Sequence, residues 1–332
     1  MDFKNNLEKI ENFQENQTIT SFFIVRKSEL RSTKNNKPYL HLELGDATGR
    51  IGAKLWDQAE PIYKEISEGD IIKVQGLVEL YRETKQLNIK KIRLAKQEDN
   101  VLHRDFIPQT KKNIEKLWET IETKITSISN PDLKKLIDKV FYKNNRVEKF
   151  KIAPGGKLWH HAYIGGLCEH TLSVCEICES MSMLYPHCNR DLLLTGALLH
   201  DIGKIDEYGY EKGFIDFTDQ GRLWGHISIG AQQVRKAVEE IEEESSFPEE
   251  MKKNIIHLIL SHQGEYEHGS PVLPKTLEAI ILYYSDEMDS KANAFQHIID
   301  RDTEPGKRWS KYINLVNRFL YLNQSEDEVV GE

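Results

Sequence analysis

The stretch Leu198–Lys204 reads LLHDIGK, and it decides how the second half of the chain is interpreted. It joins an apolar run to a glycine, with His200 and Asp201 adjacent at the junction. An imidazole nitrogen and a carboxylate oxygen from neighbouring residues can reach the same divalent cation. A single His-Asp pair recurs by chance, so its meaning depends on what else the chain supplies.

Further candidate ligands stand at wide intervals around this pair, each in or at the end of a segment with helical periodicity. They are His170, His226, His262 and Asp286. Two cations about 4 Å apart need several ligands and at least one carboxylate that bridges them. Asp201 is the candidate bridge, because it follows His200 at an expected helix end and both side chains can turn toward one point. Asp286 lies on an apolar helical stripe, where an unpaired carboxylate is costly to bury and a metal removes that cost.

The order His … His-Asp … His … His … Asp, with the phrases Glu-His-Thr, Gly-His-Ile and Ser-His, resembles the HD phosphohydrolase superfamily in its two-metal form. The resemblance implies that two divalent cations are held by His170, His200, Asp201, His226, His262 and Asp286. Nitrogen and oxygen donors suit Mn²⁺, Fe²⁺ or Co²⁺ and do not exclude Zn²⁺; the resemblance favours Mn²⁺. It also implies that Lys204 contacts a substrate phosphate, so that Asp201 and Lys204 are the catalytic candidates. The alternative for Lys204 is an ordinary surface lysine.

Two residues are candidates for substrate binding. His161 precedes Gly165-Gly166, a flexible approach to the first ligand, and it either lines the substrate channel or only packs. Arg222 stands four residues before His226, where its guanidinium could grip a phosphate through two hydrogen bonds.

Residues 18–96 show the alternation of short strands. Leu40, Leu42 and Leu44 alternate with polar or aromatic residues, Gly45–Gly49 supplies a turn, and a short helix is expected over 57–67. Five strands with one helix between the third and fourth is the layout of an OB-fold barrel. The phrases Asp-Ala-Thr-Gly at 46–49 and Ala-Lys-Leu-Trp at 53–56 are similar to nucleic-acid-binding members of that fold.

If the three leucines face the barrel core, aromatic and basic residues share the outward face. The candidates for nucleic-acid contact are Tyr39, His41, Lys54 and Trp56, with Lys85 near the last strand. An OB-fold grips single strands on its second-and-third-strand face, where rings stack on bases and cations follow phosphates. The alternative is that Tyr39 or Trp56 closes the barrel end and the charges only solubilise.

Chain length, net charge, apolar runs and cysteine count limit the classes of protein to which this chain can belong. A chain of 332 residues is expected to form two domains, and a formal net charge of -8 restricts nucleic-acid binding to a local basic patch. No apolar leader and no apolar run near 18 residues occur, so we expect a cytoplasmic protein without a membrane partner. Four cysteines are no disulfide scaffold, and the Cys175–Cys178 pair is expected to pack in a helical core.

The expected organisation is a small all-β OB-fold barrel followed by an all-α HD domain. We predict the barrel over 1–98, a helical linker over 99–155, the HD domain over 156–322 and an acidic tail over 323–332. The sequence leaves the oligomeric state undecided. Helices expected at 113–141 and 308–322 offer apolar faces through which a homo-oligomer could form.

This domain order, with the motif WHHAYIGGLCEHT at 159–171, resembles the YhaM-type 3′→5′ exoribonucleases of bacteria. The resemblance implies hydrolysis of single-stranded RNA to nucleoside 5′-monophosphates, with single-stranded DNA left open as a substrate. Two alternatives remain. One is an HD-type phosphodiesterase for a cyclic mononucleotide or dinucleotide, although no Gly-Tyr-Pro motif occurs. The other is a non-catalytic single-strand-binding protein.

Overall fold

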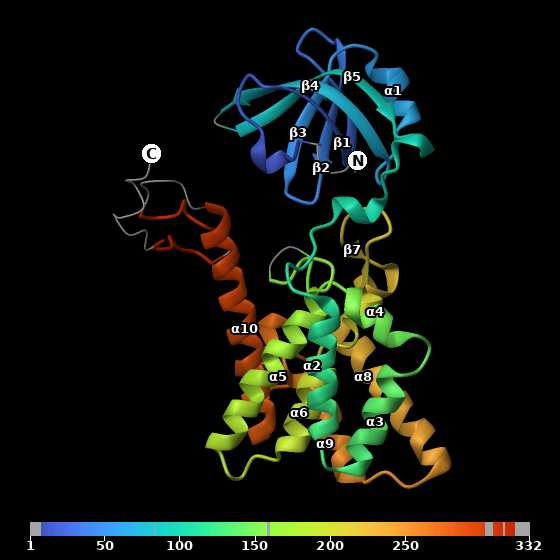
Figure 1. Ribbon diagram of the computed structural model, residues 1–332, viewed down its shortest axis with the longest axis vertical. Coiled ribbons are helices and arrows are strands. Elements are labelled where there is room, and N and C mark those ends of the chain that lie inside the picture. Colours follow the sequence, from blue (N-terminus) through green and yellow to red (C-terminus); the bar gives the residue numbers. More distant parts are fainter. Residues whose placement is uncertain (1–7, 83, 158–159, 303–307, 315, 323–332) are drawn as a thin grey trace. The chain divides into compact units, whose positions relative to one another are not determined.

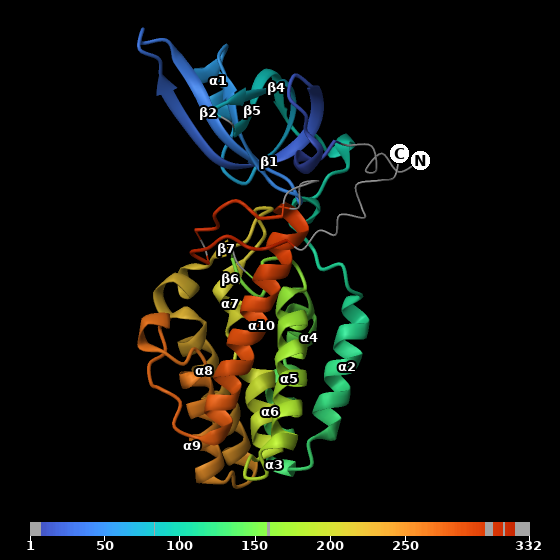
Figure 2. The ribbon, with the colours of Figure 1, turned by 90° about the vertical axis from the view of Figure 1, so that its left-hand side faces the viewer.

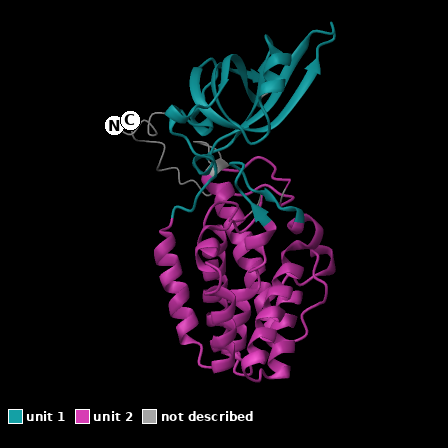
Figure 3. Cartoon of the chain, turned by 90° about the vertical axis from the view of Figure 1, so that its right-hand side faces the viewer, with its two compact units in different colours: residues 1–111, 208–219 teal, residues 112–207, 220–332 magenta. Residues whose placement is uncertain are grey.

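The computed structural model describes residues 8–82, 84–157, 160–302, 308–314 and 316–322. The chain divides into two compact units, which Figure 3 colours separately. The first contains residues 1–111 together with the distant segment 208–219, and the second contains residues 112–207 and 220–332.

The first unit is a closed five-stranded barrel, the OB-fold expected from the strand pattern (Figure 1). Its elements are β1 (Thr18–Ser32), β2 (Pro38–Gly45), β3 (Arg50–Leu55), α1 (Ala59–Glu65), β4 (Ile71–Tyr81) and β5 (Thr84–Leu94). The strand order is β1-β2-β3-β5-β4, and only the β3–β5 pairing in this barrel is parallel. Short 3₁₀ turns flank it at Ile10–Asn12, Gln97–Asp99 and His103–Phe106.

The expected alternation of side chains is confirmed. Leu40, Leu42 and Leu44 are fully buried, and the residues between them on β2 are only partly covered. Because side chains alternate across a strand, the second and third strands bury one face and leave Tyr39, His41 and Lys54 on the other.

A short hairpin from far along the chain belongs to the barrel unit. It is formed by β6 (Tyr208–Gly209) and β7 (Asp216–Phe217), with Phe214 in the loop between them. Phe214 packs against the apolar cluster of Phe22 and Ile24, and the Arg26 guanidinium lies 4.8 Å from its ring centroid. This packing makes the segment part of the barrel unit.

The second unit is helical. Its helices are α2 (Ile114–Ser127), α3 (Pro131–Phe141), α4 (Arg146–Ile152), α5 (Gly166–Leu184), α6 (Arg190–Leu199), α7 (Lys204–Glu207), α8 (Asp219–Glu244), α9 (Glu249–Ser261) and α10 (Leu277–Asp302), with a 3₁₀ turn at Tyr266–His268. Asparagine side chains cap α2, α3 and α6, as their position before an apolar-periodic run predicts.

Helices α5 and α6 form the centre of this unit, and α10 runs beside them (Figure 2). Residues 192–199 of α6 are buried without a break, and Cys168, Cys175 and Cys178 of α5 lie in the same core. The two central helices therefore bring polar side chains at their ends into an apolar interior. No helix among the described residues has both the length and the hydropathy that a membrane span requires.

The prediction of a helix over 308–322 is wrong. Antiparallel bridges pair Trp309 with Tyr321 and Ile313 with Arg318, and Ser310 N donates to Leu320 O at 2.9 Å. The segment alternates exposed aromatic side chains with buried Ser310 and Leu320. Aromatic residues around an asparagine-containing turn favour a two-stranded ribbon, and that preference prevails over the apolar spacing.

Candidate metal centre

The six predicted ligands converge on one place in the helical unit, although they come from five helices and their ends. His170 lies on α5, His200 caps the C-terminus of α6 with Asp201 directly after it, and His262 caps α9. Asp286 lies on α10. His226 follows Gly225, whose φ of 69° interrupts α8, so His226 begins the second part of that helix as expected.

One set of ligand atoms surrounds His170. Its Nε2 lies 3.2 Å from His200 Nε2, 3.3 Å from Asp201 Oδ2 and 3.2 Å from Asp286 Oδ1. His200 Nε2 is 3.4 Å from the same Asp201 oxygen. Two imidazoles and two carboxylates therefore face a common point.

A second set adjoins the first through the other oxygen of Asp201. Asp201 Oδ1 lies 3.5 Å from His226 Nε2 and 3.6 Å from His262 Nε2. Asp201 thus faces one set with each oxygen, the arrangement required of a carboxylate that bridges two cations.

The hydrogen bonds of the four imidazoles leave Nε2 of each ring facing this centre. The Nδ1 atoms contact oxygen acceptors: Ala197 O for His200 (2.8 Å), Ile259 O for His262 (2.7 Å), Glu207 Oε1 for His226 (3.1 Å) and Asp289 Oδ2 for His170 (2.7 Å). Carbonyl and carboxylate oxygens cannot donate, so each Nδ1 carries the proton. A neutral ring then has its lone pair on Nε2, the atom that would bind a cation.

The residues fit a pair of divalent cations. Asp201 Oδ1, His226 Nε2 and His262 Nε2 are buried and have no hydrogen-bond partner within the described part of the chain. Leaving such groups unsatisfied costs roughly 1–3 kcal/mol each, more for a charged group, and cations would satisfy all three. Burial also lowers the pKa of His262, which favours the neutral ring that a metal requires.

Lys204 and Asp201 form a buried ion pair. Lys204 Nζ lies 2.6 Å from Asp201 Oδ2, and the lysine is 5% exposed. Burial opposes ionisation of Asp201, but the Lys204 ammonium and the nearby imidazoles outweigh it and hold the pKa of the carboxyl well below its ordinary value. The structure therefore places Lys204 at the centre rather than on the surface.

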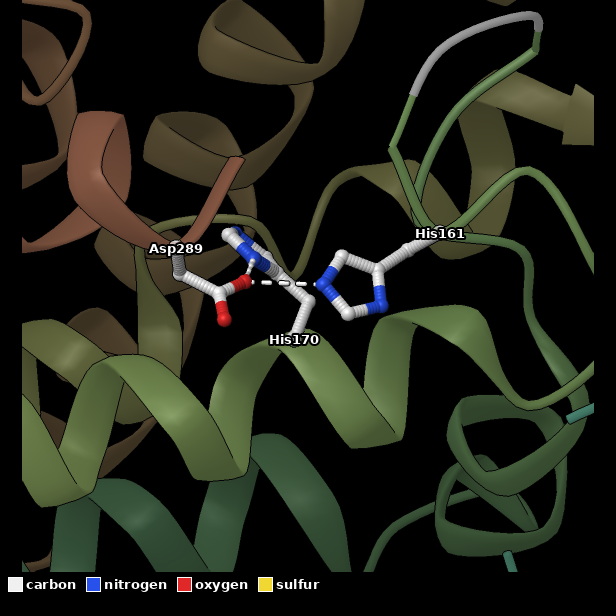
Figure 4. A group of neighbouring side chains, drawn as sticks. All are labelled: His161, His170 and Asp289. Atoms are coloured by element: carbon white, nitrogen blue, oxygen red, sulfur yellow. Dashed lines mark hydrogen bonds and ion pairs between the residues drawn. The ribbon is translucent and has the colours of Figure 1, made fainter. Parts of the chain in front are cut away.

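The two candidate substrate-binding residues have different surroundings. His161 is buried, and its Nδ1 lies 2.9 Å from the Tyr163 hydroxyl. Its Nε2 lies 2.8 Å from Asp289 Oδ2 (Figure 4). Arg222 is exposed in the first turn of α8, before the Gly225 interruption.

Sequence reasoning missed Asp289 and Glu207, the two carboxylates that accept from the imidazoles of candidate ligands. Glu207 Oε1 accepts both from His226 Nδ1 and from its backbone N–H at 2.9 Å. Asp286, Asp289 and Asn293 are spaced i, i+3 and i+7 on α10, so the sequence carried a signal for one polar helix face. Nothing comparable marks Glu207.

The barrel brings most of the predicted nucleic-acid contacts together. The Tyr39 and Trp56 rings stack with centroids 4.8 Å apart, and Lys54 Nζ lies 5.9 Å from the Trp56 ring. His41 pairs with Lys54 across β2 and β3. Tyr81 is half exposed, and its ring centroid lies 4.9 Å from Lys54 Nζ. Lys85 Nζ instead donates to Phe13 O at 2.6 Å.

Two family models match this chain. Residues 24–95 match the model of the OB-fold nucleic acid binding domain, and residues 167–291 match that of the HD domain. Among solved structures, the second OB-fold domain of replication protein A from Methanococcus maripaludis is 24% identical, with a TM-score of 0.23, over 27% of this chain and 95% of that one. The mitochondrial single-stranded DNA binding protein Rim1 of S. cerevisiae is 13% identical, with a TM-score of 0.22, over 25% and 98%.

A curated relative matches along nearly the whole chain. It is the 3′-5′ exoribonuclease YhaM of Bacillus subtilis (strain 168), 33% identical over 305 residues, which are 92% of this chain and 95% of the relative. With an OB-fold barrel, a helical HD domain and near-complete coverage at this identity, the chain belongs to the family of the 3′-5′ exoribonuclease YhaM.

Proposed function

We propose that this protein is a metal-dependent 3′→5′ exoribonuclease that hydrolyses single-stranded RNA to nucleoside 5′-monophosphates. The observation that carries the proposal is the Asp201 carboxylate, which faces two imidazoles with each of its oxygens inside a buried site. The relative's name supports the RNA substrate and the direction of cleavage.

In this proposal the six converging residues hold two divalent cations, with Mn²⁺ favoured by the family resemblance. His170, His200 and Asp286 would hold one cation, His226 and His262 would hold the other, and Asp201 would serve both. When bound, such cations supply an ionised water near neutral pH and neutralise charge on the phosphoryl group.

The residues of the chain itself perform the remaining tasks. In the four imidazoles Nδ1 faces an oxygen acceptor, so Nε2 is the atom of each ring that would hold a cation. Burial opposes the charge of Lys204, but Asp201 outweighs burial and raises the pKa of the ammonium. Its positive charge is therefore present at neutral pH to contact a phosphate oxygen. The stacked Tyr39 and Trp56 rings, with Lys54, would hold the bases and backbone of a single strand.

The test is gel analysis of 5′-labelled single-stranded RNA with a free or blocked 3′ end. Reactions contain chelator, Mn²⁺, Mg²⁺ or Zn²⁺, and parallel reactions contain single-stranded DNA or a cyclic dinucleotide. We expect stepwise shortening of the free-ended RNA with Mn²⁺, and protection by chelator or by the 3′ block. RNA of unchanged length, or cleavage of the cyclic dinucleotide alone, would refute the proposal.

A further inference from the structure

One carboxylate in the centre accepts hydrogen bonds from two imidazoles. Asp289 Oδ2 lies 2.7 Å from His170 Nδ1 and 2.8 Å from His161 Nε2, and Figure 4 shows both rings directed at this oxygen. Asp289 is outside the predicted ligand set.

His161 is fixed on several sides. Its backbone N–H donates to Asn293 Oδ1 at 3.0 Å, and its carbonyl accepts from Gly155 N at 2.9 Å. A Cβ on Gly166 would lie 2.0 Å from the His161 carbonyl oxygen, so only glycine fits there. The φ of His161 is 50°, a left-handed conformation that a β-carbon-bearing residue adopts only when its surroundings hold it.

The hydrogen-bond directions exclude a simple third cation site. His161, His170 and Asp289 are close enough to hold an ion. However, His170 would then have to bind cations through both ring nitrogens, which requires loss of both its protons. A neutral His170 that binds through Nε2 keeps its proton on Nδ1, and that proton is the one Asp289 accepts.

We infer that Asp289 is a positioning residue that sets the orientation and tautomer of His170, and that His161 holds Asp289 in place. His161 is therefore assigned a structural hold on the centre in preference to a substrate contact. The inference rests on the proposed function only in treating His170 as a metal ligand. It makes the α10 face formed by Asp286, Asp289 and Asn293 a continuous support for the centre.

The test measures Mn²⁺ binding to the metal-free full-length protein, by electron paramagnetic resonance of the free ion, without RNA. We compare wild type with Asp289→Ala, Asp289→Asn, His161→Ala and the control Glu287→Gln. Glu287 is a carboxylate on the same helix that pairs with Lys291. Thermal unfolding verifies that each variant is folded, and Asp289→Asn carries the test if Asp289→Ala does not fold.

We expect Asp289→Ala to weaken the binding of one of two Mn²⁺ ions by about 10- to 100-fold, the usual cost of losing a hydrogen-bond partner of a metal ligand. Asp289→Asn keeps one acceptor oxygen, so its Mn²⁺ affinity should lie between those of wild type and Asp289→Ala. His161→Ala should weaken Mn²⁺ binding less than Asp289→Ala does. Glu287→Gln should bind Mn²⁺ as wild type does. Excess Mn²⁺ should restore the RNA cleavage of Asp289→Ala toward that of wild type.

Two results would overturn the inference. One is wild-type affinity and stoichiometry in Asp289→Ala. The other is a stoichiometry that falls by one while the remaining ions bind as before, which would make Asp289 a ligand. Failure of the proposed function is a separate result, namely wild-type protein that binds Mn²⁺ and leaves RNA intact.

Discussion

Trp56→Ala should weaken single-stranded RNA binding without damaging the barrel. Trp56 follows the last residue of β3, and the Leu40–Leu55 pairing places it opposite Tyr39. The side chain is 37% exposed, so part of its ring remains accessible for a base. Its loss removes a stacking face and the ring that lies 5.9 Å from Lys54 Nζ.

The size of the effect follows from this geometry. Loss of one stacking aromatic costs about 1–3 kcal/mol, which is roughly a 5- to 140-fold rise in Kd at 1.4 kcal/mol per decade. Because Tyr39 remains as a neighbouring stacking ring, we expect the lower half of this range, about 1–2 kcal/mol. Trp56→Phe keeps a stacking face and should lose less.

The assay is fluorescence anisotropy of labelled single-stranded RNA in chelator, which prevents cleavage during the titration. Thermal midpoints of both variants show whether the barrel is intact. An unchanged Kd for Trp56→Ala at an unchanged thermal midpoint would show that the ring only closes the barrel end, and would return the Tyr39–Trp56 pair to a structural role.

Four other outcomes are expected. Asp201→Ala should abolish RNA shortening in Mn²⁺ while anisotropy shows RNA binding within about twofold of wild type; near-normal turnover would contradict the bridging role. Lys54→Ala should make the slope of log K against log salt shallower by about 0.7, the value for one phosphate contact on a single strand. Burial raises the pKa of the Cys168 and Cys178 thiols to about 12, so a thiol reagent should modify them only after unfolding. The unfolded thiols ionise near pH 8.5 (about the model-peptide value), so the free energy of unfolding should fall as pH rises from there toward 12, measured by denaturant titration.

Much of the fold could be predicted from local patterns. The alternation of Leu40, Leu42 and Leu44 predicted the barrel strands, and all three side chains are buried. Asn130 and Pro131 mark the start of α3 locally, because a capping side chain and a proline at the first helical position both favour a helix start. The ribbon at 308–322 was missed because apolar spacing alone does not distinguish a helix from a short aromatic hairpin.

The carboxylates that accept hydrogen bonds from the imidazoles of the candidate site were harder to predict than its candidate ligands. His170, His200 and His262 stand at helix ends or beside recognisable phrases, so their order along the chain was visible. Glu207 and Asp289 act on a neighbouring imidazole. Glu207 looks like any other acidic residue on a helix, and the polar spacing of Asp286, Asp289 and Asn293 does not show which imidazole Asp289 contacts. Their partners lie 19 and 119 residues away, beyond any local pattern.

The sequence by itself determined the two kinds of unit, the identity of six candidate donor side chains and the aromatic and basic character of one barrel face. Only the tertiary structure decided that Asp201 faces two sets of imidazoles, that each ring keeps its proton on Nδ1, and that His161 is enclosed by Asp289 and Tyr163. The physical reason is that residue type and spacing fix what a side chain can donate or accept, whereas the direction of a hydrogen bond depends on helices that meet only after the chain has folded.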